Sequence, residues 1–252
     1  MSWPPLQRED TEQFLDDPQA ERERRKTDLA LAYRLFGALR WGSLGDGHIS
    51  ARDPIETDHL WLLAYGVSFD QASVDQLVLV GPNGVPATAA KSGKDVSINE
   101  TAFNIHHPIH EARPDIVSAA HTHTPWGTPF AAEARVFDPI IQEAALFWGD
   151  QALHDDEQVE VNTYDGGKRI AASLGGNRLC VLRNHGLLTV GASVAETVGY
   201  FVAAERVAEA HLKARNPVPI SAESAELAHQ SLTTHDAGWL MFQWLIRRHL
   251  TP

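Results

Sequence analysis

The sequence predicts one α/β domain with a helical tail, and three observations support this fold class. Apolar residues recur with helical spacing between residues 21 and 41, and Gly42 follows as a stop signal. Short apolar segments bounded by turn residues predict strands, and the clearest of these, 76–80, is followed by the turn sequence Gly-Pro-Asn-Gly. Neither an internal repeat nor a low-complexity linker divides the 252 residues, so one domain accounts for them.

The first part of the chain is expected to form an arm, a helix and the start of a sheet. Residues 1–19 are rich in Pro, Gln, Asp and Glu without periodicity, which predicts a flexible N-terminal arm. The domain that follows, 20–220, opens with the helix 21–41. The strands predicted after this helix lie at 48–52, 60–64 and 76–80.

The second part of the chain is expected to complete the sheet and add helices. From Ala102 onward, apolar residues recur at spacings of three and four, which predicts a helix that Pro108 should bend or restart. The apolar run 179–182 is typical of a buried strand. Capping-box spacing at Ser193 then opens a long helix. A helical C-terminal tail, 221–252, is expected to pack on the domain or on a neighbouring subunit.

Composition and charge exclude several classes of protein. The formal net charge is -12, with 33 acidic against 21 basic residues, so the chain lacks the basic surface that nucleic-acid binding requires. No apolar stretch approaches the roughly 20 residues that span a bilayer, and no signal peptide is visible. The single cysteine, Cys180, cannot form an internal disulfide. We therefore expect a cytoplasmic protein that binds a small molecule and neither nucleic acid nor membrane.

Histidines two positions apart on a predicted strand offer a metal site. His121 and His123 belong to the strand expected at 116–123, and alternate residues of a strand share a face. A third ligand is expected from His185, at the end of an apolar run, where Gly186 allows close backbone approach. Three imidazoles with an open coordination position are typical of a catalytic rather than a structural site. Such an ion would polarise a bound carbonyl or carboxylate group.

These histidines also have simpler interpretations. A His-x-His pair alone is a weak signal, because ordinary strand histidines produce the same spacing. His106 and His110 are four residues apart and share one side of the predicted helix. They suggest a proton relay or a second metal pair, whereas surface or packing roles account for most such pairs.

Four motifs occur in order between residues 25 and 215. They are Gly-His-Ile-Ser-Ala-Arg at 47–52, Gln-Leu-Val-Leu-Val at 76–80, Arg-Pro-Asp at 113–115 leading into His-Thr-His-Thr-Pro-Trp-Gly at 121–127, and Arg-Asn-His-Gly-Leu-Leu at 183–188. Together they resemble the class II aldolase/adducin family. The resemblance implies a three-layer α/β/α fold with a central, mainly antiparallel sheet. It also implies one divalent metal on His121, His123 and His185, and a homotetramer with active sites near subunit boundaries.

The chain departs from the sugar-phosphate aldolases of that family at positions that determine the reaction. Those enzymes use zinc and a glutamate 19 residues before the first metal-binding histidine, where this chain has Ala102, and Glu100 lies two residues too early. Glu100 and Thr101 occupy the segment where those enzymes bind phosphate with small hydroxyl residues, and His48 replaces an asparagine. A carboxylate in that segment would repel a phosphate dianion. The substrate is therefore expected to be a small non-phosphorylated oxo or hydroxy acid.

Three functions follow from these expectations. The first is a metal-dependent lyase of the aldolase or decarboxylase type. The second is a non-haem iron(II) dioxygenase, because His48, Ile105-His106 and the segment 138–142 are similar to an adducin-like bacterial branch that includes secondary-metabolite enzymes of the novobiocin and clorobiocin type. The third is an adducin-like non-enzymatic binding module, which would have no need of a metal triad. Neutral imidazoles suit both Zn²⁺ and Fe²⁺, with Mn²⁺ and Co²⁺ as further options.

Further site residues are expected around the metal. Glu100 is the candidate for the catalytic acid or base, although the helix dipole also favours a solvent-facing carboxylate in the first turn of a helix. The candidates for substrate binding are His48, Ser50, Thr101, Trp126 and Gln142. His48 could instead serve the turn in which it lies, and Trp126 could be a core anchor rather than the wall of an aromatic pocket.

Overall fold

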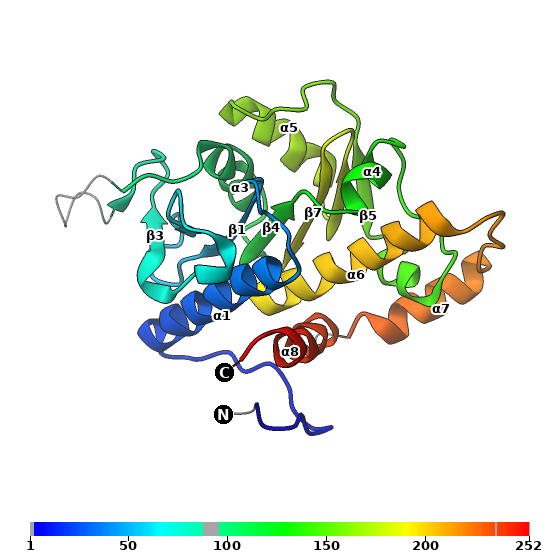
Figure 1. Cartoon of the computed structure of the whole chain (residues 1–252), viewed down its shortest axis with the longest axis horizontal. Helices are drawn as coiled ribbons and strands as arrows, with labels where there is room; N and C mark the ends of the chain where they lie inside the picture. The colour runs from blue at the N-terminus through cyan, green and yellow to red at the C-terminus, as the bar shows by residue number, and fades with distance from the viewer. Residues whose placement is uncertain (1–2, 88–95, 235, 252) are drawn as a thin grey trace.

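A seven-stranded sheet forms the middle layer of the protein (Figure 1). The computed structural model describes residues 3–87, 96–234 and 236–251. The strands are β1 (Gly47–Arg52), β2 (Leu60–Leu63), β3 (Leu77–Val80), β4 (Ser118–Thr122), β5 (Gln151–His154), β6 (Leu179–Leu182) and β7 (Gly186–Gly191). Their spatial order is β3-β2-β1-β4-β7-β6-β5, and every neighbouring pair is antiparallel except β5 and β6.

Helices cover both faces of this sheet. They are α1 (Pro18–Ala38), α3 (Glu100–Ala112), α4 (Gly127–Ala131), α5 (Tyr164–Leu174), α6 (Val194–Lys213), α7 (Ala222–Leu232) and α8 (Ala237–His249), with the short 3-10 helices η1 (Phe69–Gln71), η2 (Val74–Gln76) and η3 (Gln142–Phe147). Helices α1, α6 and α8 lie on one side, and α3 and α5 lie on the other (Figure 1). The predicted three-layer α/β/α fold with a mainly antiparallel sheet is confirmed.

Alternation along the strands separates the two hydrophobic cores. On β6, Leu179 and Val181 pack into the core beneath α1, α6 and α8, whereas Cys180 and Leu182 pack into the core beneath α3 and α5. A strand that is buried on both faces reads as a continuous apolar run, which is why 179–182 was recognisable in the sequence. On β1, Ile49 and Ala51 point to the α1 side. The intervening positions of β1 therefore face α3.

Helix ends differ from the predicted ones for local reasons. Helix α1 begins earlier than predicted, at Pro18, because Asp17 caps it by accepting a hydrogen bond from the backbone N–H of Ala20 at 2.7 Å. It ends at Ala38 rather than at residue 41, since Arg40 adopts a φ of 62°. The predicted strands lie within about two residues of the observed ones.

Helix α3 continues through Pro108 without a restart. Proline has no N–H to donate to the carbonyl of Asn104, four residues earlier. Helix α5 approaches α3 at that same carbonyl: a Cβ placed on Gly167 would lie 1.8 Å from the oxygen of Asn104. Glycine at this position therefore permits close packing of α5 against the turn that proline leaves without a helical hydrogen bond.

The residues predicted as an arm and a tail contact each other and the domain. Trp3 Nε1 donates to the carbonyl of Leu250 at 3.0 Å, and the backbone N–H of Glu12 donates to Asp236 at 2.9 Å. Residues 3–17 thus carry no helix or strand but are held by specific contacts. Helix α8 lies against α6 where Gly199 meets Gly238. Within the described ranges, no helix is long and apolar enough to cross a membrane.

Candidate metal centre

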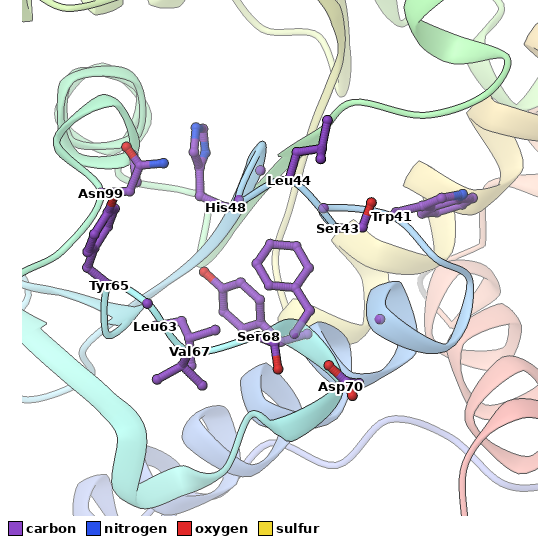
Figure 2. Close-up of a pocket in the computed structure, with 18 of the residues that line it drawn as sticks. Trp41, Ser43, Leu44, His48, Leu63, Tyr65, Val67, Ser68, Asp70 and Asn99 are labelled. Atoms are coloured by element: carbon purple, nitrogen blue, oxygen red, sulfur yellow. The ribbon is translucent and has the colours of Figure 1, made fainter.

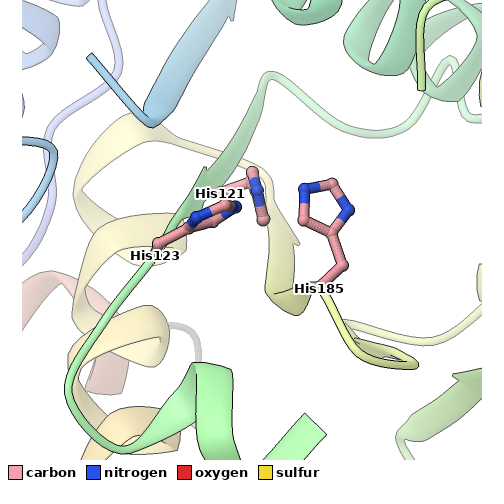
Figure 3. Close-up of side chains that lie close together, drawn as sticks. All are labelled: His121, His123 and His185. Carbon is pink, nitrogen blue, oxygen red and sulfur yellow. The ribbon is translucent and has the colours of Figure 1, made fainter. Parts of the chain in front are cut away.

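The three predicted metal ligands come from neighbouring parts of the sheet. His121 lies on β4, His123 lies one residue beyond the end of that strand, and His185 lies in the turn between β6 and β7. Because β7 pairs with β4, the turn that precedes β7 lies beside the end of β4. Figure 3 shows the three side chains lying together although 64 residues separate the first from the last.

Each of these imidazoles offers one nitrogen to a common position. The three nitrogens lie within 4.8 Å of one another. The ring centroids are 4.6 Å apart for His121 and His185, 5.1 Å for His123 and His185, and 5.4 Å for His121 and His123. Three imidazole nitrogens without a thiolate form the donor set of an open, catalytic zinc or iron site.

Burial keeps the imidazoles of His121 and His185 in the neutral form that binds metals. Burial and the neighbouring histidines lower the pKa of His185 to about 4 and place the pKa of His121 well below its ordinary value. His121 Nδ1 lies 2.8 Å from the carbonyl oxygen of Leu187, so this nitrogen carries the proton and Nε2 keeps its lone pair. Asp46 Oδ2 lies 3.6 Å from His123 Nδ1. The residues present therefore fit a divalent ion.

A buried carboxylate on α6 positions the segment that follows His123. Glu205 accepts hydrogen bonds from the Thr124 hydroxyl at 2.6 Å and from the backbone N–H groups of Trp126 and Gly127 at 2.9 and 2.6 Å. Burial outweighs these donors and raises the pKa of Glu205 above its ordinary value. Sequence reasoning missed this residue, although a glutamate within the apolar stretch 203–208 was a usable signal.

A cavity of about 500 Å³ lies beside the histidine cluster. Its wall includes the aromatic residues Tyr33, Trp41, Tyr65 and Phe69. Figure 2 shows His48 at this wall, between Asn99 and Leu44, with Tyr65 and Trp41 on opposite sides of the view. The three metal-ligand candidates are not among the lining residues. His48 connects the two features, because its ring centroid lies 5.2 Å from that of His121.

His48 and Ser50 lie in a buried hydrogen-bonded chain that joins β1 to α3. His48 Nδ1 lies 2.6 Å from His106 Nε2, His106 Nδ1 lies 2.6 Å from Ser50 Oγ, and Ser50 Oγ lies 2.9 Å from His110 Nε2. We refer to His48, His106, Ser50 and His110 as the histidine chain. The helical spacing of His106 and His110 suggested their shared side but not their partners on β1.

The other predicted site residues lie outside the cavity lining. Glu100 is exposed in the first turn of α3, and the Thr101 hydroxyl donates to Asn99 Oδ1 at 2.7 Å. Trp126 is half-buried at the start of α4, with Lys213 Nζ 4.4 Å from its ring centroid. Gln142 is exposed at the first residue of η3. The lining instead includes Ala102, the position that the glutamate of the sugar-phosphate aldolases would occupy.

The fold is a three-layer one with a mainly antiparallel sheet, and three histidines lie together near the ends of its central strands. Residues 27–212 match the family described as Class II Aldolase and Adducin N-terminal domain. The chain therefore belongs to this family.

Two relatives from Streptomyces are each 34% identical to the chain over 218 residues. One is 4-hydroxy-3-prenylphenylpyruvate oxygenase/4-hydroxy-3-prenylbenzoate synthase of Streptomyces roseochromogenus subsp. oscitans, in which the match covers 85% of this chain and 77% of the relative. The other is Decarboxylase NovR of Streptomyces niveus, with 85% and 79% covered. Alpha-adducin of Mus musculus is 32% identical over 173 residues, which are 68% of this chain but 23% of adducin.

Solved structures show the same fold. L-fuculose 1-phosphate aldolase from Glaciozyma antarctica PI12 superposes with a TM-score of 0.81 at 28% identity, covering 95% of this chain and 97% of that one. An aldolase II superfamily protein from Pseudomonas syringae superposes with a TM-score of 0.79 at 28% identity, covering 90% and 92%. The expected relation to the class II aldolase/adducin family and to NovR-type enzymes is thereby confirmed.

Proposed function

We propose that the protein is a metal-dependent carbon-carbon lyase that acts on a small non-phosphorylated oxo or hydroxy acid. The observation that carries this proposal is the convergence of three imidazoles beside an aromatic-walled cavity whose lining has Ala102 in place of a carboxylate. Membership of the aldolase family and the resemblance to a decarboxylase support the same reaction class.

The residues of the site divide between holding the ion and holding the substrate. His121, His123 and His185 would hold one divalent ion, Zn²⁺ or Fe²⁺, with Mn²⁺ or Co²⁺ as further options. When bound, the ion supplies a positive charge that polarises a substrate carbonyl or carboxylate. His48 lies between this position and the cavity, where it can contact the polar end of the substrate. The aromatic wall would bind the apolar part and exclude water.

The absence of a carboxylate at residue 102 favours decarboxylation over aldol cleavage. In the decarboxylation of a 3-oxo acid, the bond to the carboxyl carbon breaks, carbon dioxide leaves, and the bonding electron pair stays on the substrate as an enolate that later takes up a proton. Aldol cleavage instead requires a base to remove a hydroxyl proton at the start. A positioned general base contributes about 10²- to 10⁴-fold in rate, so an aldolase without one would be slow.

The charge around the cavity favours a substrate without a phosphate group. Among the lining residues that the structure describes, Arg40 is the single cation and Asp70 is an acid, and both are exposed. Phosphate dianions are normally held by several N–H donors and cationic groups acting together. An aromatic oxo acid, with one carboxylate and an apolar ring, suits this lining better.

A non-haem iron(II) dioxygenase is the second candidate. Its support is the relative named as an oxygenase, which is as similar to this chain as the decarboxylase is. Neutral imidazoles alone do not distinguish zinc from iron. A non-enzymatic adducin-like module is less well supported, because the chain matches 23% of adducin and keeps three histidines together at one position.

The test combines metal analysis with a small substrate panel. Protein purified without oxygen is analysed for zinc and iron, then incubated with oxaloacetate, a 4-hydroxy-2-oxo acid, 4-hydroxyphenylpyruvate or L-fuculose 1-phosphate while carbon dioxide and oxygen are measured. Carbon dioxide release without oxygen uptake supports the lyase, and release coupled to oxygen uptake supports the dioxygenase. Efficient cleavage of the sugar phosphate would overturn the proposed substrate class. His185→Ala and protein-free mixtures control for spontaneous decarboxylation.

A further inference from the structure

The histidine chain runs from the cavity into the protein interior. Its two members on β1 occupy alternate positions and therefore share the face toward α3, and its two members on α3 are one helical turn apart. His48 lines the cavity, whereas His110 lies at the other end, 2% exposed. Heavy-atom distances of 2.6, 2.6 and 2.9 Å make three consecutive hydrogen bonds.

Counting protons leaves two ways to fill these bonds. A neutral imidazole has one N–H and one lone pair, and a hydroxyl donates once. The rings of His48, His106 and His110 are buried, and the hydrogen bonds that join them involve no carboxylate, so we take all three as neutral. Ser50 Oγ could accept from both His106 and His110, but its own hydroxyl hydrogen would then be buried without an acceptor. All three bonds are therefore expected to point the same way along the chain. One direction leaves a spare N–H at His110 Nδ1, and the other leaves it at His48 Nε2.

The surroundings of the two ends select between these directions. His110 Nδ1 is buried and has no hydrogen-bond partner among the residues that the structure describes. The Arg52 guanidinium donates to the backbone carbonyl oxygen of the same residue at 2.6 Å, so it offers a spare N–H there no acceptor. A buried donor without an acceptor disfavours this arrangement by about tenfold or more in population. A spare N–H on His48 instead meets the cavity.

We infer that the histidine chain fixes the tautomer of His48, so that Nε2–H faces the cavity and donates a hydrogen bond to a substrate oxygen. The chain runs from His110 Nε2–H to Ser50 Oγ, from Ser50 Oγ–H to His106 Nδ1, and from His106 Nε2–H to His48 Nδ1. His48 is the catalytic residue, and the other three are positioning residues. The substrate contact rests on the proposed function, whereas the tautomer does not.

This assignment makes His48 a donor and not a base. A donor held beside the ion position stabilises negative charge that develops on a substrate oxygen when the neighbouring carbon-carbon bond breaks. Its orientation is set before the substrate arrives, because rotating the hydroxyl or any ring would break the chain. The neutral imidazole of His48 therefore supplies a polar group at the cavity, whereas Ala102 supplies none.

The tautomer is measured directly by nitrogen NMR of the full chain labelled with ¹⁵N-histidine. The protein is studied without substrate, both metal-free and loaded with zinc, and the His48 signals are assigned by their loss in His48→Gln. We expect the His48 proton on Nε2 in both forms. In Ser50→Ala the chain is broken and the two tautomers should mix, whereas Ser50→Thr, which keeps the hydroxyl, should restore the wild-type pattern. A proton on Nδ1 in the wild type, or an unchanged pattern in Ser50→Ala, would overturn the inference.

A matched control comes from the neighbouring histidine. His107 is buried on the same helix but bonds to Tyr164 and to the carbonyl of Asp58, outside the chain. His107→Gln should leave the His48 tautomer unchanged. A shift of the same size as in Ser50→Ala would mean that general disturbance of α3, and not the hydroxyl, is responsible.

Kinetics with the panel substrate that is turned over distinguishes donor from base. Glutamine can present an N–H near the position of Nε2, whereas leucine cannot, so His48→Gln should stay within about tenfold of the wild type and His48→Leu should lose about 10²- to 10³-fold in kcat. Equal losses of kcat in the two variants would mark His48 as a base. Loss of bound zinc in either variant would mark it as a metal ligand. Each of these results would overturn the assignment. If no substrate is turned over, the proposed function fails while the NMR result still decides the tautomer.

Discussion

His121, His123 and His185 occupy positions where a ring can be removed without emptying the core. His123 and His185 lie beyond strand ends, and the ring of His121 lies against the other two imidazoles. A ring in such a position contributes to a site more than to the packing of the sheet. Function and stability should therefore separate in these variants.

We predict that His121→Ala, His123→Ala and His185→Ala each lose most of the bound metal while keeping the fold. Removing one of three ligands lowers affinity by orders of magnitude. Elemental analysis measures the bound metal, and far-ultraviolet circular dichroism tests whether the fold is kept. His59→Ala, a half-buried histidine outside the cluster, is the control. Wild-type metal content in all three variants would refute the site.

Glu100 is predicted to contribute little to catalysis. Its side chain is exposed and does not line the cavity. It lies in the first turn of α3, where the helix dipole stabilises a carboxylate. Glu100→Gln should change kcat/KM by less than about tenfold. A loss above about 10³-fold with metal still bound would mark it as a relocated base and return the protein to the ordinary aldolases.

The sequence predicts those residues of the candidate site that a local pattern reveals, such as alternation along a strand or the end of an apolar run. The pair His121 and His123 follows from strand alternation, and His185 from its place after an apolar strand. Only part of the histidine chain could be predicted from the sequence. Helical spacing groups His106 with His110, but it does not show which strand the helix covers. That information requires the sheet order, which no local pattern contains.

At the scale of single elements, α6 links the sheet to the segment that follows His123. The helix begins at Ser193, whose hydroxyl accepts from the backbone N–H of Glu196 at 3.0 Å, and this cap was readable in the sequence. Nine residues after Glu196, about two and a half helical turns, Glu205 receives its three donors from the segment after His123. The helix therefore holds in place a loop that has little regular structure of its own.

Glu205→Ala should destabilise the protein by about 3 kcal/mol, because two buried backbone N–H groups would lose their acceptor at a cost of about 1–3 kcal/mol each. Urea unfolding measures this change. Metal affinity should also fall, since the loop carrying His123 loses its anchor. Glu209→Ala, one turn along the same helix, removes a residue paired with Lys213 and should change stability by less than about 0.5 kcal/mol. Equal effects in both variants would contradict the anchoring role.

The elements themselves were largely predictable, and their arrangement was not. Strand 179–182 and the helix opening at Ser193 follow from apolar runs and cap chemistry. The parallel pairing of β5 with β6, and the position of β4 between β1 and β7, depend on contacts between distant parts of the chain. The three-layer order came from the family resemblance and not from periodicity.

At the scale of the whole molecule, a buried ionic network joins the N-terminal residues to α1 and α6. Glu21 pairs with Arg24 and Arg25 at 2.7 Å each, Arg24 also reaches Glu12 at 3.3 Å, and the Ser193 hydroxyl donates to Glu12 at 2.9 Å. Burial opposes ionisation of Glu21, but the hydrogen bonds from both arginines outweigh it and lower its pKa to about 2.

Glu21→Gln should reveal a pH-dependent part of the stability. A folded-state pKa near 2 against an ordinary value of 4.5 means that the ionised side chain stabilises the fold above pH 4.5, and that this is lost as the pH falls toward 2. At pH 7 the variant should lose about 3 kcal/mol of unfolding free energy. The difference from the wild type should shrink at pH 3. Glu23→Gln, exposed on the same helix, should show no such trend, and a pH-independent loss in Glu21→Gln would contradict the assignment.

The contact between Trp3 and Leu250 brings the first and last described residues together (Figure 1). A short Gly/Ser linker could join them, and the exposed stretch 214–219 between α6 and α7 offers a place for new ends. Such a circular permutant, opened between Arg215 and Asn216, would keep every strand beside its present neighbours. We expect it to retain the circular dichroism spectrum and the metal content of the parent. Failure to fold would mean that the order in which the elements are joined, and not only their pairing, guides the chain to this sheet.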